Sequence, residues 1–239
     1  MRKTTLGVAL FSATFAVAAP LPPERPRDLS RWEGWISIEP RRWPKAPEPP
    51  TAVAPASPAC LAGLAELGVE ATAAEPPASG NAACLVEQPV RLKSIRAGAA
   101  TVRIAGEPLV ACAFAAQFGA FVREAAAPLA RGATGAELQA IEAGGGYECR
   151  PRNRVPGAKI SAHGRGLALD VAALTLSDGR RAAIGKAEGA PARLVEAMRR
   201  AACGYFLTVL GPGADAAHAD HLHLDLEPHG TRGTARLCQ

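Results

Sequence analysis

The sequence predicts an α+β domain in which a small antiparallel sheet has helices packed on one side. Several short segments alternate polar and apolar residues, as half-buried strands do. Two longer segments place apolar residues at helical spacing, and turns rich in glycine and proline separate these elements. Aromatic residues make up only 5% of the 239 residues, so we expect a core of mainly alanine, leucine and valine.

The first half of the predicted domain contains two helices and two strands. In order, we expect a helix over 59–67, a loop over 70–83, strands over 89–95 and 99–104, a long helix from about 108, and a short element of undecided type over 135–140. Pro108 suits the first turn of the long helix. The apolar stripe of this helix, which contains Phe114, Phe118 and Phe121, is expected to lie in the core.

The second half is expected to add most of the sheet. The predicted elements are a short strand over 147–150, an irregular loop over 151–162, a strand over 168–176, a helix over 191–203, and strands over 205–210 and 221–226. On the helix, Glu196 can pair with Arg200 four residues later. Alternation along the last strand places His221, His223 and Asp225 on one face.

The N-terminus has the pattern of a secretory signal over residues 1–19. Arg2 and Lys3 form a positive start, residues 6–17 form a short apolar stretch, and residues 16–18 fit a small-residue cleavage site. The apolar stretch is short for a membrane span, which needs about 20 residues. We therefore expect a periplasmic or secreted protein, and an uncleaved membrane anchor is the alternative.

Residues 20–57 are rich in proline and are predicted to form an extended linker before a domain over 58–239. All three tryptophans, Trp32, Trp35 and Trp43, lie in this segment. They either dock on the surface of the domain or form a contact site for a wall polymer or a partner. The net charge of +5 reflects either a well-solvated surface or attraction to an anionic polymer. The sequence lacks the blocks of basic residues interleaved with aromatics that would indicate nucleic-acid binding. We also expect the protein to be a monomer.

Six cysteines in a secreted chain predict three disulfides. The spacing contains no CxxC pair, so a cysteine-based zinc knuckle or a redox motif is not expected. Six cysteines allow 15 pairings, among which sequence alone does not choose. Pairing of neighbours predicts the bridges Cys60–Cys84, Cys112–Cys149 and Cys203–Cys238.

Two segments far apart in the sequence hold four of the five histidines: Ser161-Ala-His-Gly-Arg-Gly-Leu-Ala-Leu-Asp170 and His218-Ala-Asp-His-Leu-His223. Glycines can let the first segment turn tightly and bring His163 beside Asp170. Histidines two apart on a strand point the same way. A loop histidine, a strand aspartate and a histidine from an adjacent strand would form the three-ligand set that catalytic zinc sites use, with water in the fourth position. We therefore predict a Zn²⁺ site.

These motifs resemble two known groups of proteins. The pattern Ser161-x-His163-x-x-Gly166-x-Ala168-x-Asp170, followed by a terminal His-x-His, is similar to the zinc D-alanyl-D-alanine peptidases and the related lysostaphin and hedgehog group. The resemblance to the extensin-like C-terminal domain of bacterial secreted proteins is closer. It rests on Tyr147-x-Cys149-Arg150, the SxHxxGxALD stretch, Val209-Leu-Gly-Pro-Gly213 and His218-x-Asp-His-x-His-Leu-Asp225.

The resemblance implies zinc held by His163, Asp170 and His223 in a fold with a small antiparallel sheet. It also implies that Arg150 and Ser161 lie near the substrate. The D-alanyl-D-alanine peptidases carry a glutamate three residues before the last ligand, where this chain has the shorter Asp220. The arrangement HxxHxH over residues 218–223 is similar to that of the penicillin-insensitive murein endopeptidases. This similarity implies that His221, rather than Asp220, takes the role of the base.

Three functional hypotheses follow from these motifs. The first is a zinc hydrolase that cuts amide bonds in peptidoglycan peptides, in which His221 or Asp220, with His218 nearby, assists water and the leaving amine. The second is a non-catalytic wall-binding module with a structural or vestigial zinc site. The third is the same chemistry directed at a secreted protein or peptide.

Overall fold

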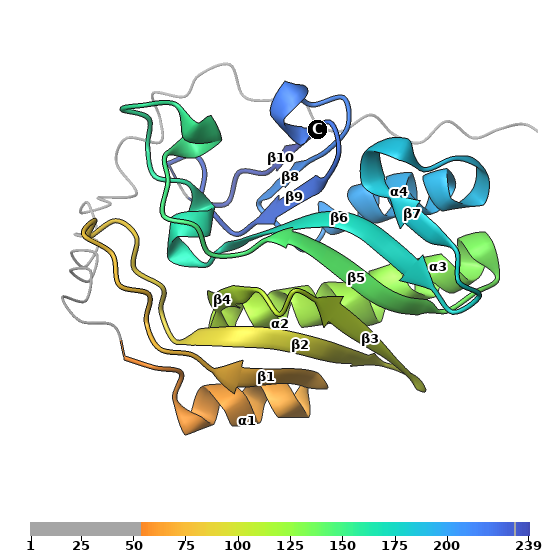
Figure 1. Ribbon diagram of the computed structural model, residues 1–239, viewed down its shortest axis with the longest axis horizontal. Coiled ribbons are helices and arrows are strands. Elements are labelled where there is room, and N and C mark those ends of the chain that lie inside the picture. Colours follow the sequence, from red (N-terminus) through yellow and green to blue (C-terminus); the bar gives the residue numbers. More distant parts are fainter. Residues whose placement is uncertain (1–53, 232) are drawn as a thin grey trace, which may run out of the picture. The chain divides into compact units, whose positions relative to one another are not determined.

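The computed structural model describes residues 54–231 and 233–239. The predicted signal, almost all of the predicted linker and its three tryptophans lie outside the described residues. In the described part, a sheet is combined with four α-helices and several short helical turns (Figure 1). The predicted mixture of helices and strands is confirmed. No helix in these ranges is both long and apolar enough to cross a membrane.

The described helices are α1 (Pro58–Glu66), α2 (Cys112–Phe121), α3 (Ala127–Thr134) and α4 (Gly189–Ala202). A π-helical turn over Val122–Ala126 joins α2 to α3. The described strands are β1 (Val69–Ala73), β2 (Pro89–Ala97), β3 (Ala100–Ala105), β4 (Leu109–Ala111), β5 (Leu138–Gly145), β6 (Ala168–Leu176), β7 (Arg181–Ala183), β8 (Thr208–Leu210), β9 (Leu222–Asp225) and β10 (Leu237–Cys238).

The sheet is larger than the small antiparallel sheet expected, and it is mixed. Its order is β1-β2-β3-β5-β6-β9-β8-β10, with β4 also paired to β2 and β7 also paired to β6. The pairs β3/β5 and β8/β10 are parallel. A parallel pair needs a long crossover connection, and between β3 and β5 the chain passes through α2 and α3 (Figure 1).

Three local predictions are corrected by pairing with β2 or by backbone contacts in loops. Val69–Ala73, expected to begin a loop, is β1 on the edge of the sheet, and Leu109–Ala111, expected to be helical, is β4. Both pair with β2, a partner distant enough in the chain that no local pattern reveals it. The predicted strand over 147–150 is instead irregular, although the amide of Tyr147 donates to the carbonyl of Leu109, the first residue of β4.

The core confirms the predicted phenylalanine stripe. Phe114, Phe118 and Phe121 of α2 are fully buried, and Phe206 packs among them with ring centroids 5.5–6.4 Å apart. Such aromatic pairs add about 0.5–1.5 kcal/mol each beyond the area they bury. The four phenylalanines of the described residues are thus concentrated at one place in the core. The predicted pair Glu196–Arg200 on α4 also forms, at 2.7 Å.

The three disulfides include one of the predicted pairings. Cys203 is bonded to Cys238, as predicted. The other two predicted bridges are wrong, because the structure joins Cys60 to Cys112 and Cys84 to Cys149. Pairing of sequence neighbours fails because α1 packs against α2, which places Cys60 beside the first residue of α2 rather than beside Cys84.

The two faces of β9 carry different kinds of side chain. Leu222 and Leu224 are fully buried in the hydrophobic core. His223 and Asp225 alternate with them and therefore point to the opposite face. That face of β9, together with β6 beside it, forms the floor of the pocket described next.

Candidate metal centre

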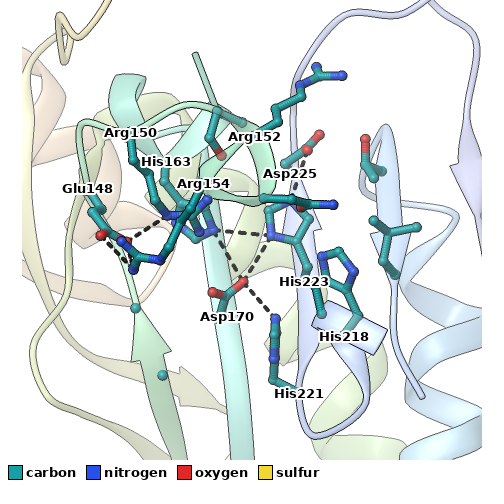
Figure 2. Close-up of a pocket in the computed structure, with 18 of the residues that line it drawn as sticks. Glu148, Arg150, Arg152, Arg154, His163, Asp170, His218, His221, His223 and Asp225 are labelled. Atoms are coloured by element: carbon teal, nitrogen blue, oxygen red, sulfur yellow. Dashed lines mark hydrogen bonds and ion pairs between the residues drawn. The ribbon is translucent and has the colours of Figure 1, made fainter. Parts of the chain in front are cut away.

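His163, Asp170 and His223 converge from a helical turn and two neighbouring strands. His163 lies in the 3₁₀ turn Ala162–Arg165, Asp170 lies on β6, and His223 lies on β9. In the antiparallel pairing of β6 with β9, Asp170 stands opposite His223. Side chains opposite each other on such a pair are direct neighbours. Figure 2 shows Asp170 between the two imidazoles. The structure therefore brings together the three residues predicted as ligands.

The spacing of the three donor atoms suits a zinc ion. Asp170 Oδ1 lies 2.9 Å from His223 Nδ1 and 3.3 Å from His163 Nε2. The two ring nitrogens are 3.2 Å apart. Tetrahedral coordination with zinc–nitrogen bonds of about 2.0–2.1 Å separates ligand atoms by about 3.3 Å. Within the described residues this is the one group of His, Cys, Asp or Glu close enough to hold a metal ion.

Outer hydrogen bonds determine which ring nitrogen faces the cluster. His163 Nδ1 donates to the carbonyl of Gly146 at 2.6 Å, so its Nε2 carries the free lone pair. His223 is turned the other way: its Nε2 donates to Asp225 Oδ2 at 3.0 Å and its Nδ1 faces Asp170. Such partners fix the orientation of metal-binding histidines. Two imidazoles and one carboxylate thus point at one position, and the donor set fits zinc.

Without a metal, the His223 ring is protonated between the carboxylates of Asp170 and Asp225. Burial alone would lower the pKa of His223, but its hydrogen bonds to Asp170 and Asp225 outweigh burial and raise the pKa to about 9. Burial alone would raise the pKa of Asp170, but hydrogen bonds from His163 and His223 outweigh it, so the pKa lies far below its usual range. Asp170 is therefore ionised at neutral pH, as a metal ligand must be.

His221 and Asp220, the two candidates for the base, occupy different places. His221 Nε2 lies 3.6 Å from Asp170 Oδ1, and its ring lines the pocket. The Asp220 side chain is 83% exposed and does not line the pocket. Its Oδ1 lies 3.0 Å from His221 Nδ1, the ring nitrogen that faces away from Asp170. Asp220 can thus orient His221, with Nε2 toward the cluster, but does not face the cluster itself.

His218 forms a second imidazole–carboxylate pair with a residue that the sequence analysis missed. Asp215 Oδ1 accepts from His218 Nδ1 at 2.6 Å and from the amides of Ala217 and His218. The His218 ring is buried, 5.6 Å from that of His223. The Asp-x-x-His spacing before a short helical turn is a capping signal that identifies Asp215 in retrospect.

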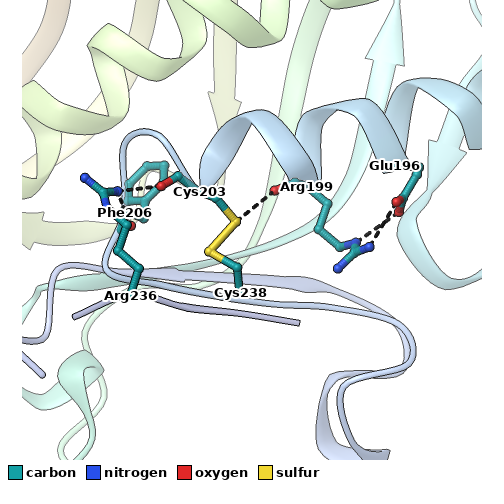
Figure 3. Close-up of a disulfide and its surroundings, with 6 residues drawn as sticks. All are labelled: Glu196, Arg199, Cys203, Phe206, Arg236 and Cys238. Atoms are coloured by element: carbon teal, nitrogen blue, oxygen red, sulfur yellow. Dashed lines mark hydrogen bonds and ion pairs between the residues drawn. A yellow bond between two sulfur atoms is a disulfide. The ribbon is translucent and has the colours of Figure 1, made fainter. Parts of the chain in front are cut away.

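All five histidines of the chain line one pocket of about 650 Å³. His229, to which the sequence analysis assigned no role, pairs with Thr208 Oγ1 at 2.7 Å, on the wall that β8 and β10 form and that is called the far wall below. Leu210 and Leu237 also line the pocket. The strand β10, which carries Leu237, is tied to the end of α4 by Cys203–Cys238 and by hydrogen bonds from Arg236 (Figure 3).

The two residues expected near the substrate both line the pocket. Ser161 is buried, and its amide donates to the carbonyl of Arg150 at 3.0 Å. The Arg150 Nε donates to Glu148 Oε2 at 2.7 Å. The guanidinium of Arg150 is therefore already paired with a carboxylate of the protein. Arg152 and Arg154 line the same side of the pocket and were not singled out from the sequence.

Gly166 ends the turn that carries His163. Its backbone conformation strains any other residue, and its surroundings leave no room for a side chain. Its φ is +63°, and a Cβ there would lie 2.7 Å from both the amide nitrogen of Ala111 and a methyl group of Val86. Gly179 also has a positive φ, +86°, but a Cβ there would meet open space. Comparison of the two glycines therefore distinguishes the cost of backbone strain, which both share, from the cost of steric crowding, which only Gly166 has.

Replacement Gly179→Ala is expected to lower the free energy of unfolding by roughly 1–2 kcal/mol, from backbone strain alone. Replacement Gly166→Ala is expected to cost about 1–3 kcal/mol more, because crowding is added to the strain. Urea unfolding followed by circular dichroism measures both. Equal losses in the two variants would contradict the close packing of this turn.

A family model described as extensin-like protein C-terminus matches residues 58–239. This span begins at the first residue of α1 and includes all six cysteines and the whole pocket. The comparisons with curated proteins and with solved structures found no match.

Proposed function

We propose that this chain, which belongs to the extensin-like protein C-terminus family, is a zinc-dependent hydrolase that cleaves amide bonds in peptidoglycan peptides. The observation that carries the proposal is the convergence of His163, Asp170 and His223 on one position that opens into a pocket. Three protein ligands with an open fourth position are typical of catalytic rather than structural zinc sites. The N-terminal signal pattern and the three disulfides agree with a periplasmic or secreted location.

The residues around the ligands have the chemistry that amide hydrolysis needs. When bound, a zinc ion would polarise the amide carbonyl and make water a better nucleophile near neutral pH. His221, oriented by Asp220, would accept the proton of the attacking water at Nε2. His218, oriented by Asp215, would donate a proton to the leaving amine. The exposure of Asp220 favours His221 as the base and gives Asp220 a positioning role.

Digestion of muropeptides tests the proposal. Zinc-loaded protein is expected to release new amines and carboxylates from a panel of cross-linked and linear muropeptides, detected by mass spectrometry. The same protein carrying His163→Ala is expected to be inactive. Identical product profiles for the two proteins across the panel would overturn the hydrolase proposal.

Binding without cleavage is the second candidate, and the arginines on the pocket wall favour it. Arg150, Arg152 and Arg154 line one side of the pocket and would attract a polymer that carries carboxylates. A wall-binding module would sediment with insoluble peptidoglycan before and after removal of metal, and would leave the polymer uncut. Cleavage by the zinc-loaded protein, with none by the metal-free protein, would exclude this candidate.

Zinc binding is expected to release about one proton per ion at pH 7–8. In the metal-free protein the pKa of His223 is raised to about 9, so its ring is charged in this range, and a metal at Nδ1 must displace a proton. Zinc affinity should therefore rise as the pH rises toward 9. Calorimetric titration in buffers of different ionisation enthalpy measures the proton count. A binding enthalpy that is independent of the buffer would contradict it.

A further inference from the structure

We infer that Arg152 and Arg154 form a subsite for a carboxylate of the bound peptide, beside the metal ligands. The inference builds on the proposed function, because it concerns a ligand of the same pocket, but it addresses binding and does not depend on cleavage. Arg150, Arg152 and Arg154 are called the arginine rim below. All three line the pocket, as does Asn153 between them.

The arginine rim is held next to His163 by the backbone. The amide of Glu148 donates to the carbonyl of His163 at 3.3 Å, and the amide of Ser161 donates to the carbonyl of Arg150 at 3.0 Å. Pro151 and Ile160 form an isolated antiparallel bridge further along the same segment. Cys149, one residue before the rim, is bonded to Cys84. A ligand group held by the rim would therefore lie close to the reacting centre.

The carboxylates near the rim leave one guanidinium without a close partner. Glu148 is shared by Arg150 and Arg154, both at 2.7 Å, so one carboxylate neutralises two cations. Burial by itself would raise the pKa of Glu148, but these hydrogen bonds outweigh it, so the pKa is lowered and Glu148 stays charged. Only Glu227, in the described part of the chain, approaches Arg152, at 3.8 Å, which is too long for a hydrogen bond.

Glu227 is occupied by other cations and does not project into the pocket. Its side chain is 1% exposed and pairs with Lys159 and Arg165. The three cations of the arginine rim, together with Lys159 and Arg165 behind the pocket lining, therefore share two carboxylates, Glu148 and Glu227. The neighbouring acids Asp170, Asp215 and Asp225 are engaged by histidines. The surplus of positive charge selects an anionic ligand.

The shape of the charged groups favours a carboxylate. Arg152 is 44% and Arg154 is 69% exposed, so both guanidinium groups remain accessible from the pocket. Guanidinium groups match carboxylates through paired N–H donors. Asn153 and Arg154 have positive φ values of 50° and 58°. Two consecutive residues in the left-handed region store backbone strain, which is typical of functional loops.

The experiment compares two rhodamine-labelled tripeptides, Ala-Ala-Ala with a free carboxylate and the same peptide as its C-terminal amide. Fluorescence anisotropy with zinc-loaded protein measures affinity at the first time point, and any later fall in anisotropy reports cleavage separately. The acid is expected to bind about tenfold more tightly than the amide, the size of one charge-assisted contact. The preference should shrink as salt rises from about 50 to about 500 mM.

Two variants with opposite expected effects on the preference for the acid, together with two matched controls, make the test specific. Arg152→Gln is expected to reduce the preference for the acid to about twofold. Glu148→Gln is expected to increase it several-fold, because Arg150 and Arg154 lose their internal partner. Arg200→Gln and Glu196→Gln make the same changes of charge on α4, outside the pocket, and should leave the preference unchanged.

Equal affinity for the acid and the amide would overturn the subsite, as would a preference that persists in the combined Arg152→Gln and Arg154→Gln variant. Failure of the proposed hydrolase looks different. In that case the acid peptide binds with the expected preference, but the anisotropy never falls and no product forms.

Discussion

Replacement of His223 by alanine is expected to lower zinc affinity on the order of 100- to 1,000-fold. A zinc site with four protein ligands yields about 10–16 kcal/mol in all, so one ligand accounts for a few kcal/mol. His223 supplies Nδ1, and its removal leaves only His163 and Asp170 at the site. Competition with a chromogenic chelator measures the affinity, and elemental analysis of the purified protein measures the stoichiometry.

The control for this variant is a histidine of the same pocket. His229 pairs with Thr208 on the far wall and is not part of the ligand group, so His229→Ala is expected to keep wild-type zinc affinity. Because His223→Ala also removes a hydrogen-bond partner from Asp170 and from the buried Asp225, the fold must be tested separately. Asp170→Asn keeps the shape of the side chain and should lose zinc as well. Wild-type affinity in both His223→Ala and Asp170→Asn would contradict the assignment of the ligands.

Removal of the Cys84–Cys149 disulfide is expected to cost about 4 kcal/mol of stability and to weaken zinc binding. The chain-entropy model gives about this value for a bridge that closes a loop of 65 residues. The zinc effect has a local cause: Cys149 follows Glu148, whose amide bonds the carbonyl of His163, and the sulfur of Cys84 packs against Gly164. The measurement combines urea unfolding with chelator competition on the double serine variant.

The Cys203–Cys238 bridge is the matched control. It closes a loop of 35 residues, so its removal should cost nearly as much stability, about 4 kcal/mol. It holds β10 at the far wall and touches no proposed ligand, so zinc affinity should stay close to wild type (Figure 3). Peptide mapping without reduction tests the connectivity directly. Recovery of a Cys60–Cys84 peptide would contradict the observed pairing.

Sequence reasoning succeeded for this protein where a property is local. The alternation of residues along β9 follows from the period of two in a strand, so it placed His223 and Asp225 on one face and leucines on the other. The apolar spacing in α2 predicted its buried phenylalanines in the same way. Gly166 was recognised as a turn residue because few other residues adopt its backbone conformation.

Pairing across the sheet, by contrast, was decided only by the tertiary structure. β1 and β4 have weak patterns of their own and are strands because β2 offers them hydrogen-bonding partners. The positions of Cys60 and Cys112 follow from the packing of α1 on α2, which sequence distance does not encode. A large mixed sheet, not a small antiparallel one, is the consequence.

The candidate site shows the same division. The sequence by itself determined the types of residue: two histidine-containing segments with an aspartate, and the spacing that makes a ligand set plausible. Only the tertiary structure decided which ring nitrogen faces the cluster, through Gly146 and Asp225, and that Asp220 lies outside the pocket. It also gathered Asp215, His229 and the arginine rim around the ligands. Contacts between residues distant in the chain depend on the whole fold, and a local pattern carries no record of them.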